Sequence, residues 1–241
     1  MSPATPLPPL PTGPVDSMDA AVTRMRDIGA LLPPADGLAC FNSMYLIVTE
    51  AVRSKVKAGF YADPDFMACL DVEFANRYLS AIDGYRKQPP TAARAWSVLL
   101  ASRSDSGIAP IQFALAGLNA HINLDLALAL ISTSEDLGTT PDDGSHHLDF
   151  EKVNHTLADL DQHIRRTFEQ GILLEMDHEF VGLENLVGTF SITAAREAAW
   201  INASVLWRVR GERFLYDPYV DSVDRCVAFA GRTLLTPLRI G

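Results

Sequence analysis

A histidine and an aspartate lie four residues apart in the most apolar stretch of the chain. They are His121 and Asp125, within the segment 108–131, and Asn119 and Asn123 alternate with them. Burying such polar groups without partners costs roughly 1–3 kcal/mol each. A protein that keeps them inside must therefore pair them or use them.

Helical geometry separates these four residues into two pairs. Positions four apart share a helix face, whereas positions two apart point about 200° away from each other. His121 and Asp125 therefore form one pair, and Asn119 and Asn123 form a second pair on nearly the opposite face. Gly117 precedes His121 on its own face, which leaves room there for a close helix crossing or for a ligand.

Three interpretations of the His121/Asp125 pair stay open. The two side chains can ligate one divalent metal ion, provided that other helices supply further ligands. They can instead perform acid–base chemistry without a metal, with the carboxylate orienting the imidazole. They can also form a structural hydrogen bond that fixes the register of neighbouring helices. The amide pair is interpreted as a clamp between helices.

Further polar residues occur on mostly apolar helix faces. Asp71 falls within an apolar stripe and needs a partner, either Arg77 in a salt bridge or an ion shared with the central pair. Glu50 either pairs with Arg53 three residues later or lines the site. The candidate catalytic residues are His121, Asp125 and Asp71, and the candidate substrate-binding residues are Glu50, Asn119, Asn123 and Tyr45.

Helical periodicity dominates the chain and predicts an all-α fold. The expected helices span residues 17–32, 38–58, 63–86, 91–102, 108–137, 149–170, 184–210 and 219–235. We expect a disordered proline-rich tail at residues 1–16 and one domain at residues 17–241. This domain is predicted to be a multi-helix bundle around the central apolar helix.

Charge and cysteine content narrow the partners and the compartment. A formal net charge of −10 over 241 residues disfavours binding to nucleic acid or to an anionic membrane. Cys40, Cys69 and Cys226 lie far apart in apolar segments and are interpreted as buried thiols of a reducing compartment. His121 and Asp125 sit where a membrane-spanning helix tolerates charge least. We therefore expect a soluble, cytoplasmic protein.

Several motifs of common enzymes are missing from the sequence. It contains no glycine-rich phosphate loop, dinucleotide-binding fingerprint, HExxH metalloprotease motif or serine-hydrolase elbow. No nucleotide cofactor is expected. The leading hypothesis is a non-redox enzyme that cyclises, isomerises, eliminates from or hydrolyses a largely apolar small molecule, with or without one divalent metal. The alternative is a non-catalytic helical binding or scaffold protein.

Several strings resemble an uncharacterised family, domain-of-unknown-function family 5995. The likeness covers roughly residues 38–210, and Asn119-Ala-His-Ile-Asn123 is its most specific part. The resemblance implies a bacterial-type soluble helical protein connected with small-molecule biosynthesis, and it assigns no activity to any residue. The strings are residues 41–50, 65–78, 95–96, 117–126 and 149–154.

Overall fold

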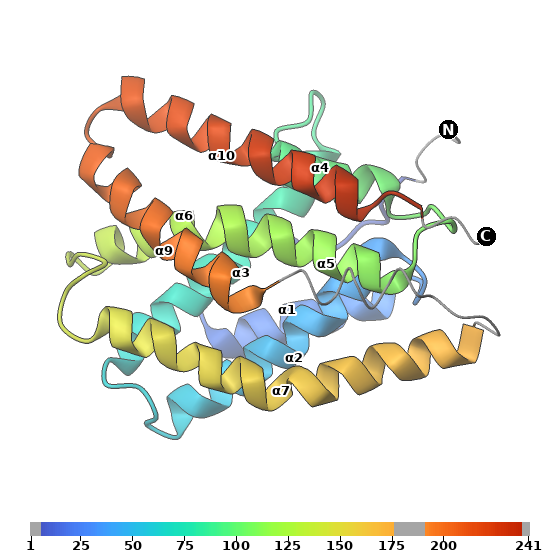
Figure 1. The fold of residues 1–241 in the computed structure, drawn as a ribbon, viewed down its shortest axis with the longest axis horizontal. Coiled ribbons are helices and arrows are strands. Elements are labelled where there is room, and N and C mark those ends of the chain that lie inside the picture. Colours follow the sequence, from blue (N-terminus) through green and yellow to red (C-terminus); the bar gives the residue numbers. More distant parts are fainter. Residues whose placement is uncertain (1–5, 176–190, 238–241) are drawn as a thin grey trace.

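Helices and their connections make up the part of the chain that the computed structural model describes, residues 6–175 and 191–237 (Figure 1). For residues 161–175 the backbone alone is described. No strand occurs in these residues, so the all-α prediction is confirmed. The elements are α1 (Met18–Leu31), α2 (Gly37–Lys57), α3 (Pro64–Arg86), α4 (Arg94–Ser102), α5 (Pro110–Ala120), η1 (His121–Asp125), α6 (Leu126–Asp136), α7 (His146–Glu175), α9 (Ile192–Val209) and α10 (Arg213–Leu234).

Side-chain caps place the starts of several helices close to their predicted positions. The Ser17 hydroxyl accepts the backbone N–H of Ala20 at the start of α1. The Asp63 carboxylate accepts the N–H of Phe66 at the start of α3, where Pro64 occupies the first helical position. Such caps satisfy backbone donors that the first turn of a helix leaves unpaired, which makes these starts predictable from sequence.

The last helix begins earlier than predicted. α10 starts at Arg213 instead of Tyr219, because Pro218 lies inside the helix and does not precede it. A proline in the second turn forgoes one backbone hydrogen bond but leaves the rest of a long helix intact. For the preceding helix, residues 184–190 of the predicted range lie outside the described residues, and α9 begins at Ile192.

The sixth predicted helix also begins earlier, at His146 instead of Asp149. Asp149 does not cap its own helix. Its carboxylate accepts the backbone N–H groups of Ala62 and Asp63, 3.0 and 2.7 Å away, and so ties α7 to the loop before α3. These partners lie more than 80 residues away in sequence, so local spacing could not predict the contact.

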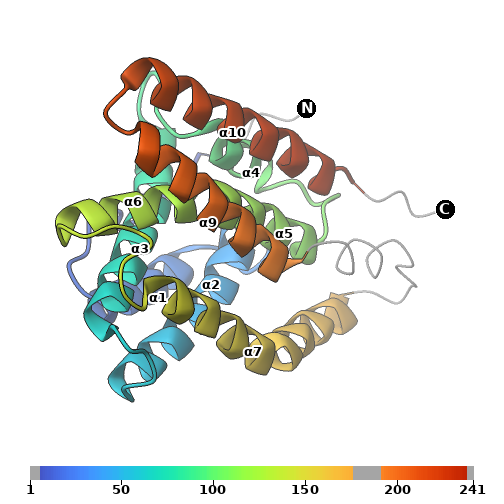
Figure 2. The same cartoon turned by 60° about the vertical axis from the view of Figure 1, so that its left-hand side comes forward.

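The segment α5–η1–α6 runs through the middle of the molecule. Figures 1 and 2 show α9 and α10 on one side of it and α1, α2 and α3 on the other. Its stretch Pro110–Asp136 is long and apolar enough to cross a membrane by composition, but 89% of its most apolar window is buried within the protein. The prediction of a buried central helix is confirmed, and the polar residues inside it meet other helices.

Gly117 is a point of close approach between α5 and α2. A Cβ atom at Gly117 would lie 2.3 Å from Cδ2 and 2.5 Å from Cγ of Phe41, well inside van der Waals contact. The small residue before His121 therefore accommodates the aromatic ring of a neighbouring helix. Of the two uses that the sequence left open for this space, the structure shows the helix crossing and not a ligand site.

Residues 6–16, which belong to the tail expected to be disordered, contact the core in this structure. Leu10 and Val15 are buried in the core, and Asn76 exchanges two hydrogen bonds of 2.8 and 2.9 Å with the backbone of Val15. The Arg103 guanidinium donates to the carbonyl of Pro6. The prolines favour an extended chain, and an extended chain can pack against a core as well as remain disordered.

The three cysteines differ in exposure. Cys40 is buried, Cys69 is half-buried and Cys226 is exposed, so the interpretation of all three as buried thiols is wrong. Cys226 belongs to α10, which covers the core from outside, so residues on its outer face meet solvent although they follow apolar neighbours in the sequence.

Candidate functional site

The central helix changes its winding at the histidine–aspartate pair. Residues His121–Asp125 form one π-helical turn, and the N–H of Leu126 donates to the carbonyl of His121, five residues back. Such a turn accommodates one extra residue in an α-helix, and it occurs often at functional sites. The sequence predicted an uninterrupted α-helix here, because hydrophobic periodicity does not register a single added residue.

Asp125 receives two N–H donors on one oxygen. His121 Nδ1 lies 3.0 Å from Asp125 Oδ2, and the indole Nε1 of Trp96 on α4 donates to the same oxygen over 2.8 Å. With Asp125 as a carboxylate, Nδ1 is the donor and Nε2 of His121 is left as an acceptor. The two donors fix the orientation of the carboxylate, and no described residue donates to its second oxygen, Oδ1.

Aromatic rings enclose the His121 imidazole. The ring of Phe74 stacks on it at 3.5 Å between centroids and 5° between planes, and the ring of Tyr45 meets it edge-on at 4.4 Å. Phe41 and Trp96 add edge-on contacts at 5.6 and 5.9 Å between ring centroids. Burial lowers the pKa of His121 below its usual 6.5, against the opposing effect of the hydrogen bond that His121 donates to Asp125. The imidazole is therefore held neutral near pH 7.

Buried polar atoms without hydrogen-bond partners gather around the aromatic rings. They belong to α2, α3 and η1: Tyr45 Oη, Thr49 Oγ1, Asp71 Oδ2 and His121 Nε2. Burial raises the pKa of Asp71 to about 7, although the charge of Arg53 opposes this shift. The predicted salt bridge from Asp71 to Arg77 is wrong.

Arg77 turns away from Asp71 toward α6. Its guanidinium donates to the carbonyl of Leu128 over 3.2 Å and to the hydroxyl of Ser132 over 2.6 Å. Six residues along a helix place Asp71 and Arg77 on different faces, so the two side chains do not meet.

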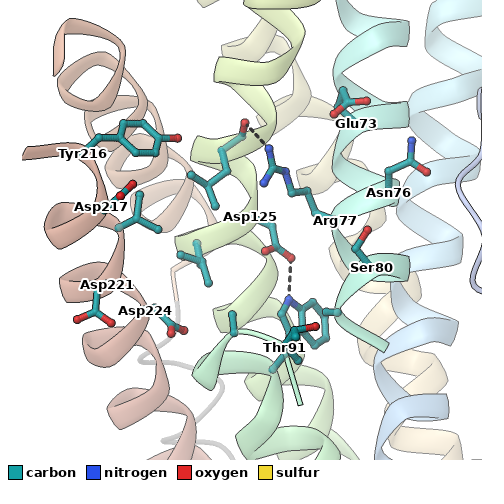
Figure 3. Close-up of a pocket in the computed structure, with 17 residues that line it drawn as sticks. Glu73, Asn76, Arg77, Ser80, Thr91, Asp125, Tyr216, Asp217, Asp221 and Asp224 are labelled. Atoms are coloured by element: carbon teal, nitrogen blue, oxygen red, sulfur yellow. Dashed lines mark hydrogen bonds between the residues drawn. The ribbon is translucent and has the colours of Figure 1, made fainter. Parts of the chain in front are cut away.

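A pocket of about 560 Å³ opens beside the pair, between α3, α4, α6 and α10 (Figure 3). Asp125 and Trp96 lie at its inner end, with Leu124 and Leu128 as apolar neighbours. His121 does not line this pocket. Of the three candidate catalytic residues, Asp125 alone can contact a molecule in the pocket, and His121 contacts it only through Asp125. Asp71 and Tyr45 do not line it either.

Carboxylates dominate the polar lining. They come from α3, η1 and α10, and Figure 3 shows them on opposite sides of the pocket around Asp125. Arg77 is the cation that lines the same pocket. The acidic lining residues are Glu73, Asp125, Asp217, Asp221 and Asp224. The sequence did not reveal the four besides Asp125, because acidic residues on two separate helices have no pattern that links them.

Among the described residues, no further metal ligands lie close to His121 and Asp125. Within residues 6–175 and 191–237, insofar as side chains are described, no group of three or more His, Cys, Asp or Glu side chains is placed to hold a metal ion. His121 Nδ1 and Asp125 Oδ2 also face each other. The third ligand expected from another helix, with Asp71 as a candidate, is not brought to the pair.

The two asparagines act as the sequence analysis interpreted them. Asn119 donates to the carbonyl of Val227 on α10 over 2.8 Å, and Asn123 donates to Asn119 over 3.2 Å. Both also line a second, shallower hollow of about 460 Å³ on the α10 side, together with Asn202 and Tyr219. Asn119 joins the central helix to α10, Asn123 supports Asn119 from the next turn, and neither lines the pocket at Asp125.

Glu50 lies away from this pocket. Its carboxylate pairs with Arg26 on α1 at 2.5 Å, and Arg53, its expected partner, pairs instead with Asp19 at 2.7 Å. Both ion pairs are partly exposed on the α1–α2 surface. The structure gives Glu50 no contact with the pocket, so its assignment as a substrate-binding residue has no support in this geometry.

Comparison with known families gives one match. Searches among curated proteins and among solved structures gave no match. The family model of unknown function DUF5995 matches residues 18–237, which include every helix described above. The chain therefore belongs to the family of unknown function DUF5995.

Proposed function

We propose that this protein is a non-redox enzyme that transfers a proton to or from a small molecule, with Asp125 as the catalytic residue. The observation that carries the proposal is the position of the carboxylate. Asp125 Oδ2 is held by Trp96 and His121, whereas Oδ1, at the inner end of a pocket, receives no hydrogen bond from a described residue. A carboxylate oriented in this way suits a general base, which removes a proton in cyclisation, isomerisation or elimination.

His121 and Trp96 are positioning residues in this proposal. Each donates an N–H to Asp125 and neither has to touch the substrate. The pocket volume of about 560 Å³ falls within the range of roughly 300–1,000 Å³ that small-molecule sites occupy. The π-helical turn supports the proposal further, because it interrupts an otherwise regular helix at the residues concerned.

A binding protein without catalytic activity is the alternative. The enclosure of His121 by aromatic rings favours it, since a fully packed imidazole also serves to fix the register of helices. In that case the same pocket would bind a ligand and release it unchanged. The two functions differ in whether the ligand is altered.

A turnover experiment separates the two. Purified protein is incubated with a small-molecule extract of the cells that produce it, without added nucleotide, and the mixture is followed by mass spectrometry. We expect the wild type to consume a component and to form a product of equal mass or of mass changed by a small group. Asp125→Asn keeps the shape of the side chain and should slow this conversion by about 10²–10⁴-fold.

Asp27→Asn is the matched control, because Asp27 is an exposed carboxylate on α1 that does not line the pocket. It should leave the conversion unchanged. A wild type that binds a component of the extract and converts none, or an Asp125→Asn variant as active as the wild type, would leave the binding function in place of the enzyme.

A further inference from the structure

We propose that the pocket at Asp125 selects an organic ammonium ion that carries a hydrocarbon part. This inference rests on the proposed function for its location and adds the class of ligand. It starts from the distribution of charge. Glu73 on α3 and Asp217 on α10 line the pocket, and neither carboxylate forms an ion pair with a described residue.

The other acidic residues of the lining are partly compensated. Arg94 donates to Asp221 over 2.6 Å and to Asp224 over 3.2 Å, and Asp224 also accepts the N–H groups of Arg94 and Ala95 at the start of α4. These two aspartates are thus occupied in joining α10 to α4. Arg77 is the one guanidinium of the lining, and it is anchored on α6.

The buried end of the pocket supplies a separate observation. The Asp125 side chain is 7% exposed, and its Oδ1 has no described donor. A carboxylate with so little exposed surface keeps little of its hydration, so a donor or a positive charge on the pocket side stabilises it. An ammonium group placed there supplies both an N–H donor and a positive charge. The free carboxylates Glu73 and Asp217, on facing helices, strengthen the attraction for a cation.

The arrangement fits an organic cation better than a metal ion. Among the described residues no three acidic or imidazole side chains converge on one point. The carboxylates are instead spread around the pocket, as Figure 3 shows. The walls between them include apolar residues, Ala81, Leu124, Leu128 and Val220, beside the uncharged polar residues Asn76, Ser80 and Thr91. A ligand with one ammonium group and a hydrocarbon chain or ring matches both the charge and the walls.

Binding of simple amines tests the inference without knowledge of the substrate. The probes are hexylammonium, 2-phenylethylammonium and hexane-1,6-diammonium, each compared with its neutral alcohol. The reporter is the indole ¹H–¹⁵N resonance of Trp96, whose N–H is bonded to Asp125. We expect at least one ammonium to shift this resonance and to bind at least tenfold more tightly than its alcohol. Glu73→Gln and Asp217→Asn should each weaken the ammonium severalfold and leave the alcohol unaffected, whereas Asp27→Asn should change neither.

Three results would overturn the inference. In the first, every ammonium binds no more tightly than its alcohol, or neither binds at millimolar concentration. In the second, the resonances that shift belong only to the hollow at Asn123. In the third, Mg²⁺ or Ca²⁺ binds more tightly than any of the ammonium ions. The turnover experiment remains separate. If the protein prefers ammonium ions but converts no component of the extract, the ligand class is supported and the proposed enzymatic function is contradicted. If it converts a neutral or anionic compound, the enzymatic function is supported and the ligand class is contradicted.

Discussion

Trp96 donates its indole N–H to Asp125 Oδ2 over 2.8 Å and so joins α4 to the π-helical turn of the central helix. Both side chains are buried, and the bond connects residues 29 positions apart in the sequence. Because His121 donates to the same oxygen, this carboxylate has one fixed orientation relative to the pocket. The hydrogen bonds to Asp125 Oδ2 therefore both hold α4 against the central helix and orient the carboxylate that lines the pocket.

Replacing Trp96 with phenylalanine should lower the free energy of unfolding by about 1–3 kcal/mol, measured by chemical denaturation. The change removes a buried donor to a charged acceptor and keeps most of the aromatic volume. Trp207→Phe is the control, since Trp207 is partly exposed and its ring contacts the Arg210 guanidinium at 3.7 Å. Equal losses from the two substitutions would argue that ring volume, and not the bond to Asp125, determines the effect.

The His121 imidazole should titrate below pH 6.5 and carry its neutral-state proton on Nδ1. Burial lowers the pKa, and the contact with Asp125 raises it. Asp125→Asn removes the favourable charge and should lower the pKa of His121 further. Long-range ¹H–¹⁵N spectra of the imidazole across a pH series give both the protonated nitrogen and the pKa.

The lowered pKa of His121 also makes the free energy of unfolding decrease as pH falls below the unfolded pKa. A histidine whose folded pKa is depressed contributes stability that is complete above the unfolded value of 6.5 and declines as pH falls toward the folded value. His121→Gln should therefore reduce the decline below pH 6.5. A wild-type pKa above 6.5, or a proton on Nε2, would contradict the hydrogen-bond arrangement described here.

Asp71 should have the opposite effect on stability in an overlapping pH range. Burial raises its pKa from 3.8 to about 7. Between these values the unfolded chain loses the proton while the folded protein keeps it, so this residue lowers the free energy of unfolding as pH rises. A single group of this kind contributes up to about 1.4 kcal/mol per pH unit.

Asp71→Asn should remove that contribution. The stability of the variant relative to wild type should rise between pH 4 and pH 7 and then level off, when denaturation is measured at several pH values. Asp27→Asn is the control and should give a difference that does not change across this interval. A parallel pair of curves for Asp71→Asn and wild type would show that Asp71 ionises normally in the folded protein.

The sequence predicted features that depend on local spacing. Four-residue spacing placed His121 beside Asp125, and apolar content placed their helix in the centre. It did not predict that Trp96 shares the carboxylate, or that α10 carries one side of the pocket, because these contacts join residues far apart in the chain. Arg77 is a further example. Its closeness in sequence to Asp71 suggested a salt bridge, but in the structure its guanidinium donates to Leu128 and Ser132 on α6.

The crossing of α2 and α5 should be intolerant of even one added carbon. In Gly117→Ala the new Cβ would meet Phe41 at Cδ2, Cγ and Cβ, at 2.3, 2.5 and 2.8 Å. These atoms lie at the base of a buried ring and cannot turn aside, so the helices must separate. Such overpacking costs about 1–3 kcal/mol or more. Because Phe41 also contacts His121 and Trp96, the indole resonance of Trp96 should shift as well.

Gly211→Ala is the control for this substitution, because a Cβ at Gly211 would meet nothing within 4 Å. It should leave the free energy of unfolding within about 0.5 kcal/mol of wild type. The double variant Gly117→Ala with Phe41→Ala should lose less stability than the two single variants lose together, since alanine lacks the Cγ and Cδ2 atoms that the new Cβ would meet. Chemical denaturation measures the stability of all four variants. If Gly117→Ala were as stable as Gly211→Ala, the two helices would have to cross farther apart than the structure places them, and the packing of Phe41 against His121 would lose its basis.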